Sequence, residues 1–222
     1  MKLIENMFLT ALLLAGAVVA FAKEKAIFKN DMKITISAEN APYFEPKNLS
    51  SGQNIQNYKW LLINVEAQTE KGNGKTGDFA DDIAMEVDVA VFNGKSKNVE
   101  QIVLFSGKVE YYSVELDGKK HNFLALVPGQ LFYRYVDKSV RPAQENLRVQ
   151  VRLYQGGELV SSGYYASKTG ITDKEQKVWF AKFQNSKNYS VKVVSDSIFG
   201  RRETPWAMFG HDKYELEKKQ NR

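Results

Sequence analysis

The stretch "IAMEVDVAVF", residues 83–92, decides the fold class. Apolar side chains recur at every second position, and Glu86 and Asp88 lie between them. Successive side chains of a β-strand point to opposite faces, whereas a helix repeats every 3.6 residues. The pattern therefore predicts a strand with one buried face, made of Ile83, Met85, Val87, Val89 and Val91.

Similar segments lie on both sides of this strand. The sequence predicts strands over residues 33–37, 58–69, 100–107, 108–116, 119–127, 130–136, 147–165 (a hairpin) and 189–195. Asp117-Gly118 and Gly156-Gly157 are hairpin-type turn signals between alternating segments. Thr172 and Glu175 form a capping-box pattern, which predicts a short helix from Asp173 to about Phe183.

Seven to nine strands with at most one short helix predict an all-β chain. We expect an antiparallel immunoglobulin-like β-sandwich, with a barrel as the alternative. The chain has no cysteine, so this sandwich would lack the inter-sheet disulfide of antibody domains. A core of this size is large enough to fold without disulfides.

The N-terminus has the layout of a secretory signal peptide. Lys2 precedes an uncharged apolar run from Met7 to Ala22, which ends in the A-x-A pattern Ala20-Phe21-Ala22. The run is shorter than the roughly 20 residues that a membrane span needs. We expect residues 1–22 to direct export to the periplasm, outer membrane surface or exterior, and membrane contact only through this segment if it is not cleaved.

The net charge of +5 is mildly basic. It could suit an anionic partner, but a modest excess of lysine also aids solubility. No motif of a nucleic-acid-binding module is present, and we expect no nucleic-acid partner.

Residues that could carry catalysis are few. His121 and His211 are the only histidines, and neither lies in a metal-binding or catalytic motif, so we interpret both as surface or packing residues. Glu86 and Asp88 share a strand face that we expect to be solvated. We therefore predict no enzyme, no catalytic residue, no metal and no cofactor. A glycosidase-like hydrolase stays an alternative that would need two close carboxylates in a cleft.

The loop "KGNGKTGDFADD", residues 71–82, imitates phosphate-binding motifs. A dinucleotide loop must be followed by a helix, but here the strand at Ile83 follows, and the P-loop pattern fails because Thr69 stands where its first glycine is required. We predict an ordinary inter-strand loop. Weak calcium binding by Asp78, Asp81 and Asp82 stays open as an alternative.

The stretch "RRETPWAMFGHDKYE", residues 201–215, is not explained by a strand. Pro205 disfavours helix at Thr204, so Glu203-Thr204-Pro205 should be extended. The aromatic residues are too apolar for a free linker, so they either cover an edge of the sandwich or dock on a partner. The candidate partner-binding residues are Arg201, Arg202, Trp206, Phe209 and Tyr214.

Part of this stretch, "ETPWAMFGHDKYE" (residues 203–215), resembles the ending of several small exported bacterial proteins. The chain is similar to small secreted immunoglobulin-like proteins associated with bacterial type IV pilus-like assembly clusters. The resemblance implies an immunoglobulin-like fold, a non-catalytic role and a place in the envelope near pilus or secretion components. The chain departs from a true pilin because no prepilin-type glycine precedes the apolar run.

These observations predict three regions: a signal peptide (1–22), a sandwich domain (23–200) and an aromatic, basic C-terminal tail (201–222). We expect a non-enzymatic exported protein that acts by protein–protein contact in a pilus-like or envelope assembly. The alternative is a glycan-binding module that uses exposed aromatic residues. Paired aromatics such as Tyr111-Tyr112 and Tyr164-Tyr165 place one ring outward, where it could stack on a sugar.

Overall fold

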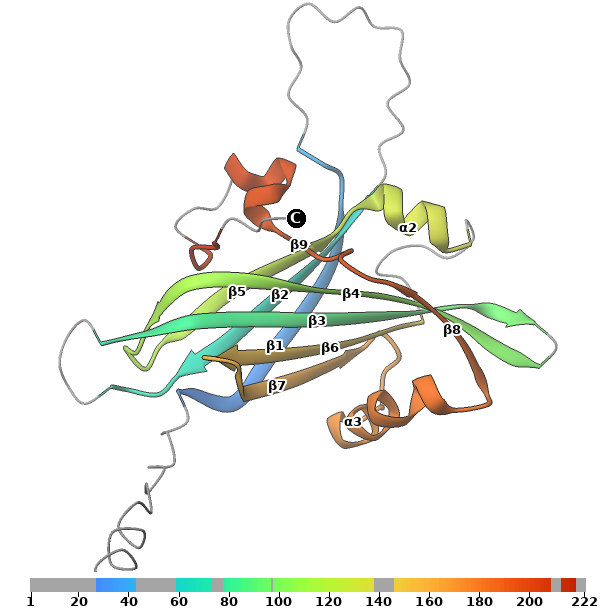
Figure 1. Cartoon of the computed structure of the whole chain (residues 1–222), viewed down its shortest axis with the longest axis horizontal. Coiled ribbons are helices and arrows are strands. Elements are labelled where there is room, and N and C mark those ends of the chain that lie inside the picture. Colours follow the sequence, from blue (N-terminus) through green and yellow to red (C-terminus); the bar gives the residue numbers. More distant parts are fainter. Residues whose placement is uncertain are drawn as a thin grey trace, which may run out of the picture.

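A computed structural model describes residues 27–42, 59–72, 78–96, 98–137, 146–208 and 213–218. These residues form two β-sheets with short helices, which confirms the predicted all-β sandwich (Figure 1). The predicted signal peptide, residues 1–22, lies outside the described residues.

The first sheet has four strands in the order β1-β2-β5-β9, and the second has five in the order β7-β6-β3-β4-β8. The strands are β1 (Phe28–Glu39), β2 (Trp60–Thr69), β3 (Phe79–Ser96), β4 (Val99–Glu115), β5 (Lys120–Val127), β6 (Leu147–Gln155), β7 (Glu158–Ala166), β8 (Tyr189–Val194) and β9 (Phe199–Gly200). The helices are α2 (Gly129–Tyr135) and α3 (Asp173–Lys182), and the 3₁₀ turns are η1 (Phe183–Asn185), η2 (Arg201–Glu203) and η3 (Pro205–Met208).

The strand order follows the immunoglobulin scheme. In that scheme strands A, B and E share one sheet, and strands C, F and G share the other. β1-β2-β5 takes the order A-B-E, and β3-β6-β7 takes the order C-F-G. β4 lies beside β3, as strand C′ does in variable-type domains.

The core lies between the two sheets and is built by the alternation seen in the sequence. The five residues of the predicted buried face, Ile83, Met85, Val87, Val89 and Val91, have exposed fractions of 0–1%. β2 and β6 alternate in the same way. Glu86 and Asp88 point away from the core and hold Arg152, with N–O distances of 3.3 and 2.7 Å.

β4 is one continuous strand, although the sequence predicts two segments on either side of Gly107. Gly107 does not break the strand. A Cβ at this position would lie 2.8 Å from the Cβ of Ile198. The glycine therefore permits a close approach between β4 and the chain after β8.

Two further expectations need correction. Residues 130–136 are not a strand, because Gly129–Tyr135 form α2, whose Phe132 inserts into the core against Phe105. With α3, this exceeds the predicted single helix. The sandwich is also not wholly antiparallel, because β8 pairs with β4 in the parallel direction. β8 can do so because α3 and η1 carry the chain across the sheet.

The predicted helix at residue 173 is present. Thr172 Oγ1 accepts a hydrogen bond from the Glu175 amide, and the Glu175 carboxylate accepts one from the Thr172 amide, so the capping box is complete. α3 covers the outer face of the second sheet, where Phe180 and Phe183 pack on Ala90, Ile102 and Leu104.

Candidate functional site

The C-terminal tail (residues 201–222) begins directly after β9, and its described residues, 201–208 and 213–218, lie against the sandwich (Figure 1). Its first part forms η2 and η3. The extended conformation expected over Glu203-Thr204-Pro205 is found at Thr204 alone, because Glu203 ends η2 and Pro205 begins η3. Residues 213–218, here called the tail segment, return to the two sheets. The tail is thus part of the fold over its described residues.

The tail segment covers an edge between the sheets. Tyr112 N donates to Leu216 O at 3.0 Å, and Lys218 N donates to Glu110 O at 2.7 Å, so the segment pairs with the second half of β4. Glu215 N also donates to the Asn122 carbonyl of β5 at 2.9 Å. Because β8 covers the first half of β4, the two C-terminal elements together close this strand's edge.

Glu217 anchors the tail segment. Its residue is 1% exposed, and its carboxylate accepts a hydrogen bond from the Arg202 amide at 2.8 Å. Gly200 makes room for this carboxylate, since a Cβ there would lie 2.7 Å from Glu217 Oε2. Burial raises the pKa of Glu217, and hydrogen bonds from the backbone amides of Arg202 and Arg201 lower it by a smaller amount.

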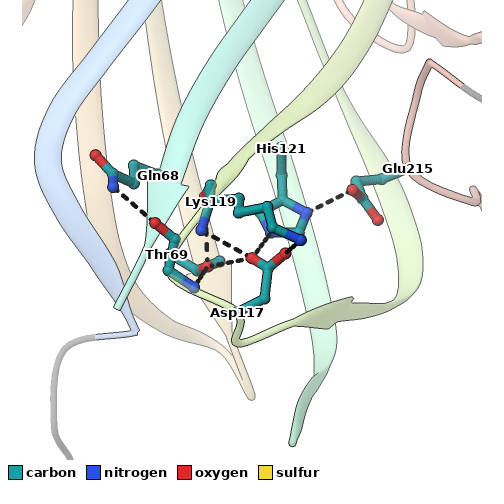
Figure 2. A network of polar contacts seen from close by, with 7 residues as sticks. Gln68, Thr69, Asp117, Lys119, His121 and Glu215 are labelled. Carbon is teal, nitrogen blue, oxygen red and sulfur yellow. Dashed lines mark hydrogen bonds and ion pairs between the residues drawn. The ribbon is translucent and has the colours of Figure 1, made fainter. Parts of the chain in front are cut away.

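His121 joins the tail segment to the β4–β5 turn (Figure 2). Its Nδ1 lies 2.7 Å from Glu215 Oε1, and its Nε2 lies 3.0 Å from Asp117 Oδ1. A neutral imidazole can donate only one hydrogen bond, whereas the protonated ring donates to both carboxylates. The arrangement therefore favours the charged ring.

The pKa of His121 follows from this geometry. Burial favours the neutral ring and lowers the pKa, but the hydrogen bonds to Glu215 and Asp117 outweigh it and raise the pKa above its usual value. Asp117 is itself held by Lys119, whose amide donates at 2.8 Å and whose ammonium lies 3.0 Å away. The interpretation of His121 as an ordinary surface or packing residue overlooked this role, because Glu215 is distant in the sequence.

The predicted partner-binding residues separate into two groups. Arg201 is buried at 1% exposure, so its guanidinium is not on the surface. Arg202 is exposed, and its Nη1 donates to the Glu217 carbonyl at 2.8 Å. Phe209 lies outside the described residues. Tyr214 is half-buried, and the Lys213 ammonium lies 5.2 Å from its ring centroid.

The outward part of the C-terminal tail is η3. Trp206 is half-buried and packs edge-to-face on Trp60, with ring centroids 5.2 Å apart. Met208 is 71% exposed, which is the largest exposed fraction among the large hydrophobic side chains of the described residues. Trp60 and Met208 are not among the candidate partner-binding residues that the sequence predicted. Together with Trp206 they form an apolar surface, here called the η3 surface.

A second surface lies on the other side of the molecule, along α3 (Figure 1). It contains a cavity of about 780 Å³, here called the α3 groove. The rings of Trp179 and Phe183 line this groove and stack nearly parallel, with ring centroids 4.2 Å apart. Trp179 Nε1 donates to the Tyr189 hydroxyl at 3.2 Å. The lining residues are Arg148, Ile171, Lys174, Glu175, Val178, Trp179, Lys182, Phe183, Ser186, Asn188 and Tyr189.

Metal and membrane chemistry find no support in the part of the chain that the structure describes. There, no group of three or more His, Cys, Asp or Glu side chains gathers as a metal site would require. Asp82, one of the three candidate calcium ligands, pairs with Lys218 at 3.0 Å instead. Within the same residues no helix is long and apolar enough to cross a membrane.

Comparison with known proteins places the fold and the family. Among curated proteins none matches this chain. A crystal structure of a protein from Akkermansia muciniphila matches with a TM-score of 0.58 and 16% identity, over 89% of this chain and 100% of that one. At this identity the likeness shows the fold alone. A family model also matches residues 21–221, which is nearly the whole chain. The chain therefore belongs to the family that this model describes, a family of pilus-related proteins.

Proposed function

We propose that this protein is an exported, non-enzymatic component of a type IV pilus-like or cell-envelope assembly, and that it acts by binding other proteins of that assembly. The observation that carries the proposal is the η3 surface. Met208 is 71% exposed and belongs to η3, as does Trp206 of the Trp60–Trp206 pair, and aromatic and methionine side chains are enriched at protein interfaces.

The family match supports the assembly context, and the charges support a binding role over catalysis. The carboxylates beside the tail segment are ion-paired: Glu110 lies 2.7 Å from Lys108, and Asp82 lies 3.0 Å from Lys218. A general acid or base would need a free carboxyl with a shifted pKa in a cleft, whereas Glu217, whose pKa is raised, is buried at 1% exposure and cannot reach a substrate. Paired surface carboxylates suit a structural component better.

Affinity capture from envelope extract tests the proposal. The bait carrying Trp206→Ala and Met208→Ala should recover pilus or secretion components at least about tenfold less than the unchanged bait, because it lacks the interface anchors. Leu159→Ala is the matched control, since Leu159 is 56% exposed but lies on β7. Equal recovery by all three baits contradicts a partner role for the η3 surface.

Glycan binding is the second candidate, and Tyr112 is the observation that favours it. Tyr112 is 49% exposed on β4, whereas its neighbour Tyr111 is buried, so one ring of this pair does point outward. Tyr164 suits a sugar less well because it packs on Phe180, with ring centroids 6.1 Å apart. Binding on a glycan array that Tyr112→Ala abolishes would favour this function over the assembly role.

A further inference from the structure

An arginine, Arg148, lines the α3 groove. A second cavity of about 190 Å³ adjoins the groove and shares Arg148, Ile171 and Tyr189 with it. The Arg148 guanidinium lies 4.5 Å from the Trp179 ring centroid and 5.5 Å from that of Phe92. Stacked in this way, it still presents its N–H edges for hydrogen bonds in the ring plane.

This arginine has rings as neighbours and forms no ion pair within 4 Å among the described residues. The rings of Trp179 and Phe92 replace part of the water around the guanidinium, and this burial lowers the pKa of Arg148. Glu100 and Glu175 act on it only as more distant charges that raise its pKa. A carboxylate that approached the N–H edge would restore the lost hydrogen bonds as a bidentate pair. The site is therefore more complementary to an anion than to a neutral group.

Two lysines extend the positive charge along α3. Lys174, Val178 and Lys182 follow each other at intervals of four residues, so they form one stripe along the helix that spans about 12 Å. All three line the groove, and Val178 is 48% exposed. The stripe alternates cation, apolar side chain and cation, which matches a segment with carboxylates on both sides of an apolar residue.

The lining residues favour a peptide over a saccharide. Sugar hydroxyls need acceptors as well as donors. The single carboxylate that lines the groove, Glu175, is held by the capping box through both the Thr172 amide and hydroxyl. This leaves a sugar with only the neutral acceptors of Ser186, Asn188 and Tyr189. Ile171 and Val178 add aliphatic surface that a peptide side chain would cover and a hydroxyl-rich ring would not.

We propose that the α3 groove binds an acidic segment of a partner protein, with carboxylates on Arg148, Lys174 and Lys182 and an apolar side chain against Val178 and Trp179. The proposal rests on the proposed function, because it assigns this protein a second contact surface with a partner of stated chemistry. It is separate from the η3 surface, which lies on the other side of the molecule (Figure 1).

Selection of peptides on the purified full chain tests this site. Panning a random peptide library should enrich sequences with two or more Asp or Glu residues around an apolar one. Their affinity should fall about tenfold, or about 1.4 kcal/mol, in the Lys174→Gln/Lys182→Gln variant, because this variant loses two ion pairs of exposed lysines. Arg148→Gln should weaken binding at least as much, and higher salt should weaken it in the unchanged protein.

Lys177→Gln is the matched control. Lys177 is exposed on α3 but does not line the groove, so its removal should change affinity less than about twofold. Equal losses in Lys177→Gln and the double variant would overturn the proposal. So would enrichment of non-acidic peptides only, no enrichment, or binding of a sulfated disaccharide in place of peptides. Peptide selection uses purified protein, so a negative result would contradict the α3 groove proposal without bearing on the envelope capture that tests the proposed function.

Discussion

The tail segment and the α3 groove both combine aromatic rings with charged side chains. In the tail segment the charges find partners within the chain: His121 lies between two carboxylates, and the Glu217 carboxylate is buried on backbone amides. In the groove, Arg148 faces rings, and Lys174 and Lys182 line an open cavity. The difference shows what decides the role of such a segment. Where the segment pairs with a sheet edge, its charged groups find hydrogen-bond partners within the chain and it becomes part of the fold. Where it covers a sheet face, its charged groups remain open to a partner protein.

The largest loss of stability should come from Phe183, which forms the buried side of the α3 groove. Phe183 is 2% exposed and stacks on Trp179, so Phe183→Ala should lower the free energy of unfolding by about 3 kcal/mol. Urea unfolding measures this. Val178→Ala on the open side of the groove should cost less than about 0.5 kcal/mol. Similar costs for both would mean that the groove lacks a rigid floor.

A smaller loss should follow from crowding the tail segment. Gly200→Ala places a methyl group 2.7 Å from Glu217 Oε2 and 3.0 Å from Val109 Cγ1, and should cost about 2 kcal/mol. In a chain that ends at residue 212 the same substitution should cost less, because the carboxylate is gone. An identical cost in both backgrounds would show that Glu217 is not docked as described.

The pH dependence of stability should also come from the tail segment. The pKa of His121 is raised in the folded state, so its contribution is complete below the unfolded value of about 6.5 and is lost as pH rises through the folded pKa. The raised pKa of Glu217 acts in the same direction, because a proton that the folded state holds more tightly favours folding at lower pH.

Thermal unfolding between pH 6 and 8 measures this dependence. The melting temperature should fall across that range in the unchanged protein and fall less in Glu215→Gln, which removes one of the two carboxylates that face His121. Lys120→Gln is a suitable control, because its Glu66 partner lies outside the His121 network. A melting temperature that rises across this range would contradict the assigned hydrogen bonds.

The smallest change in the free energy of unfolding should come from substitutions on the η3 surface. Met208→Ala should change the free energy of unfolding by less than about 0.5 kcal/mol, since the side chain is 71% exposed. Trp206→Ala should cost about 1 kcal/mol through the lost contact with Trp60. Small losses would show that reduced partner capture reflects the surface. A loss above about 3 kcal/mol for Met208→Ala would place this residue in the core.

The sequence predicted the elements that depend on residues close to one another in the chain. The alternation of residues 83–92 predicted the inward face of β3, and Thr172 with Glu175 predicted the start of α3. The missed features depend on contacts between distant residues. Gly107 resembles a break until Ile198 is known to lie against it, and the partner of His121 lies 94 residues away at Glu215.

The candidate site was also predicted only in part, because its contacts join residues that are distant in the sequence. The composition of the C-terminal tail predicted that its rings must pack somewhere, but not that Arg201 would be buried while Met208 is exposed. The groove was missed because Arg148 and Trp179 come from separate elements, β6 and α3, and each follows an ordinary pattern in its own element. Only the sheet order brings them together.

Amide hydrogen exchange of the tail segment tests the central comparison most directly. The amides of Glu215 and Lys218 donate to Asn122 and Glu110, so at pH 6 both should exchange at least about a hundredfold more slowly than in an unstructured peptide. The protection should decrease toward pH 8 after correction for the intrinsic rate. Exchange of both amides at the unstructured rate would contradict the account, because the tail would then not close the edge of β4.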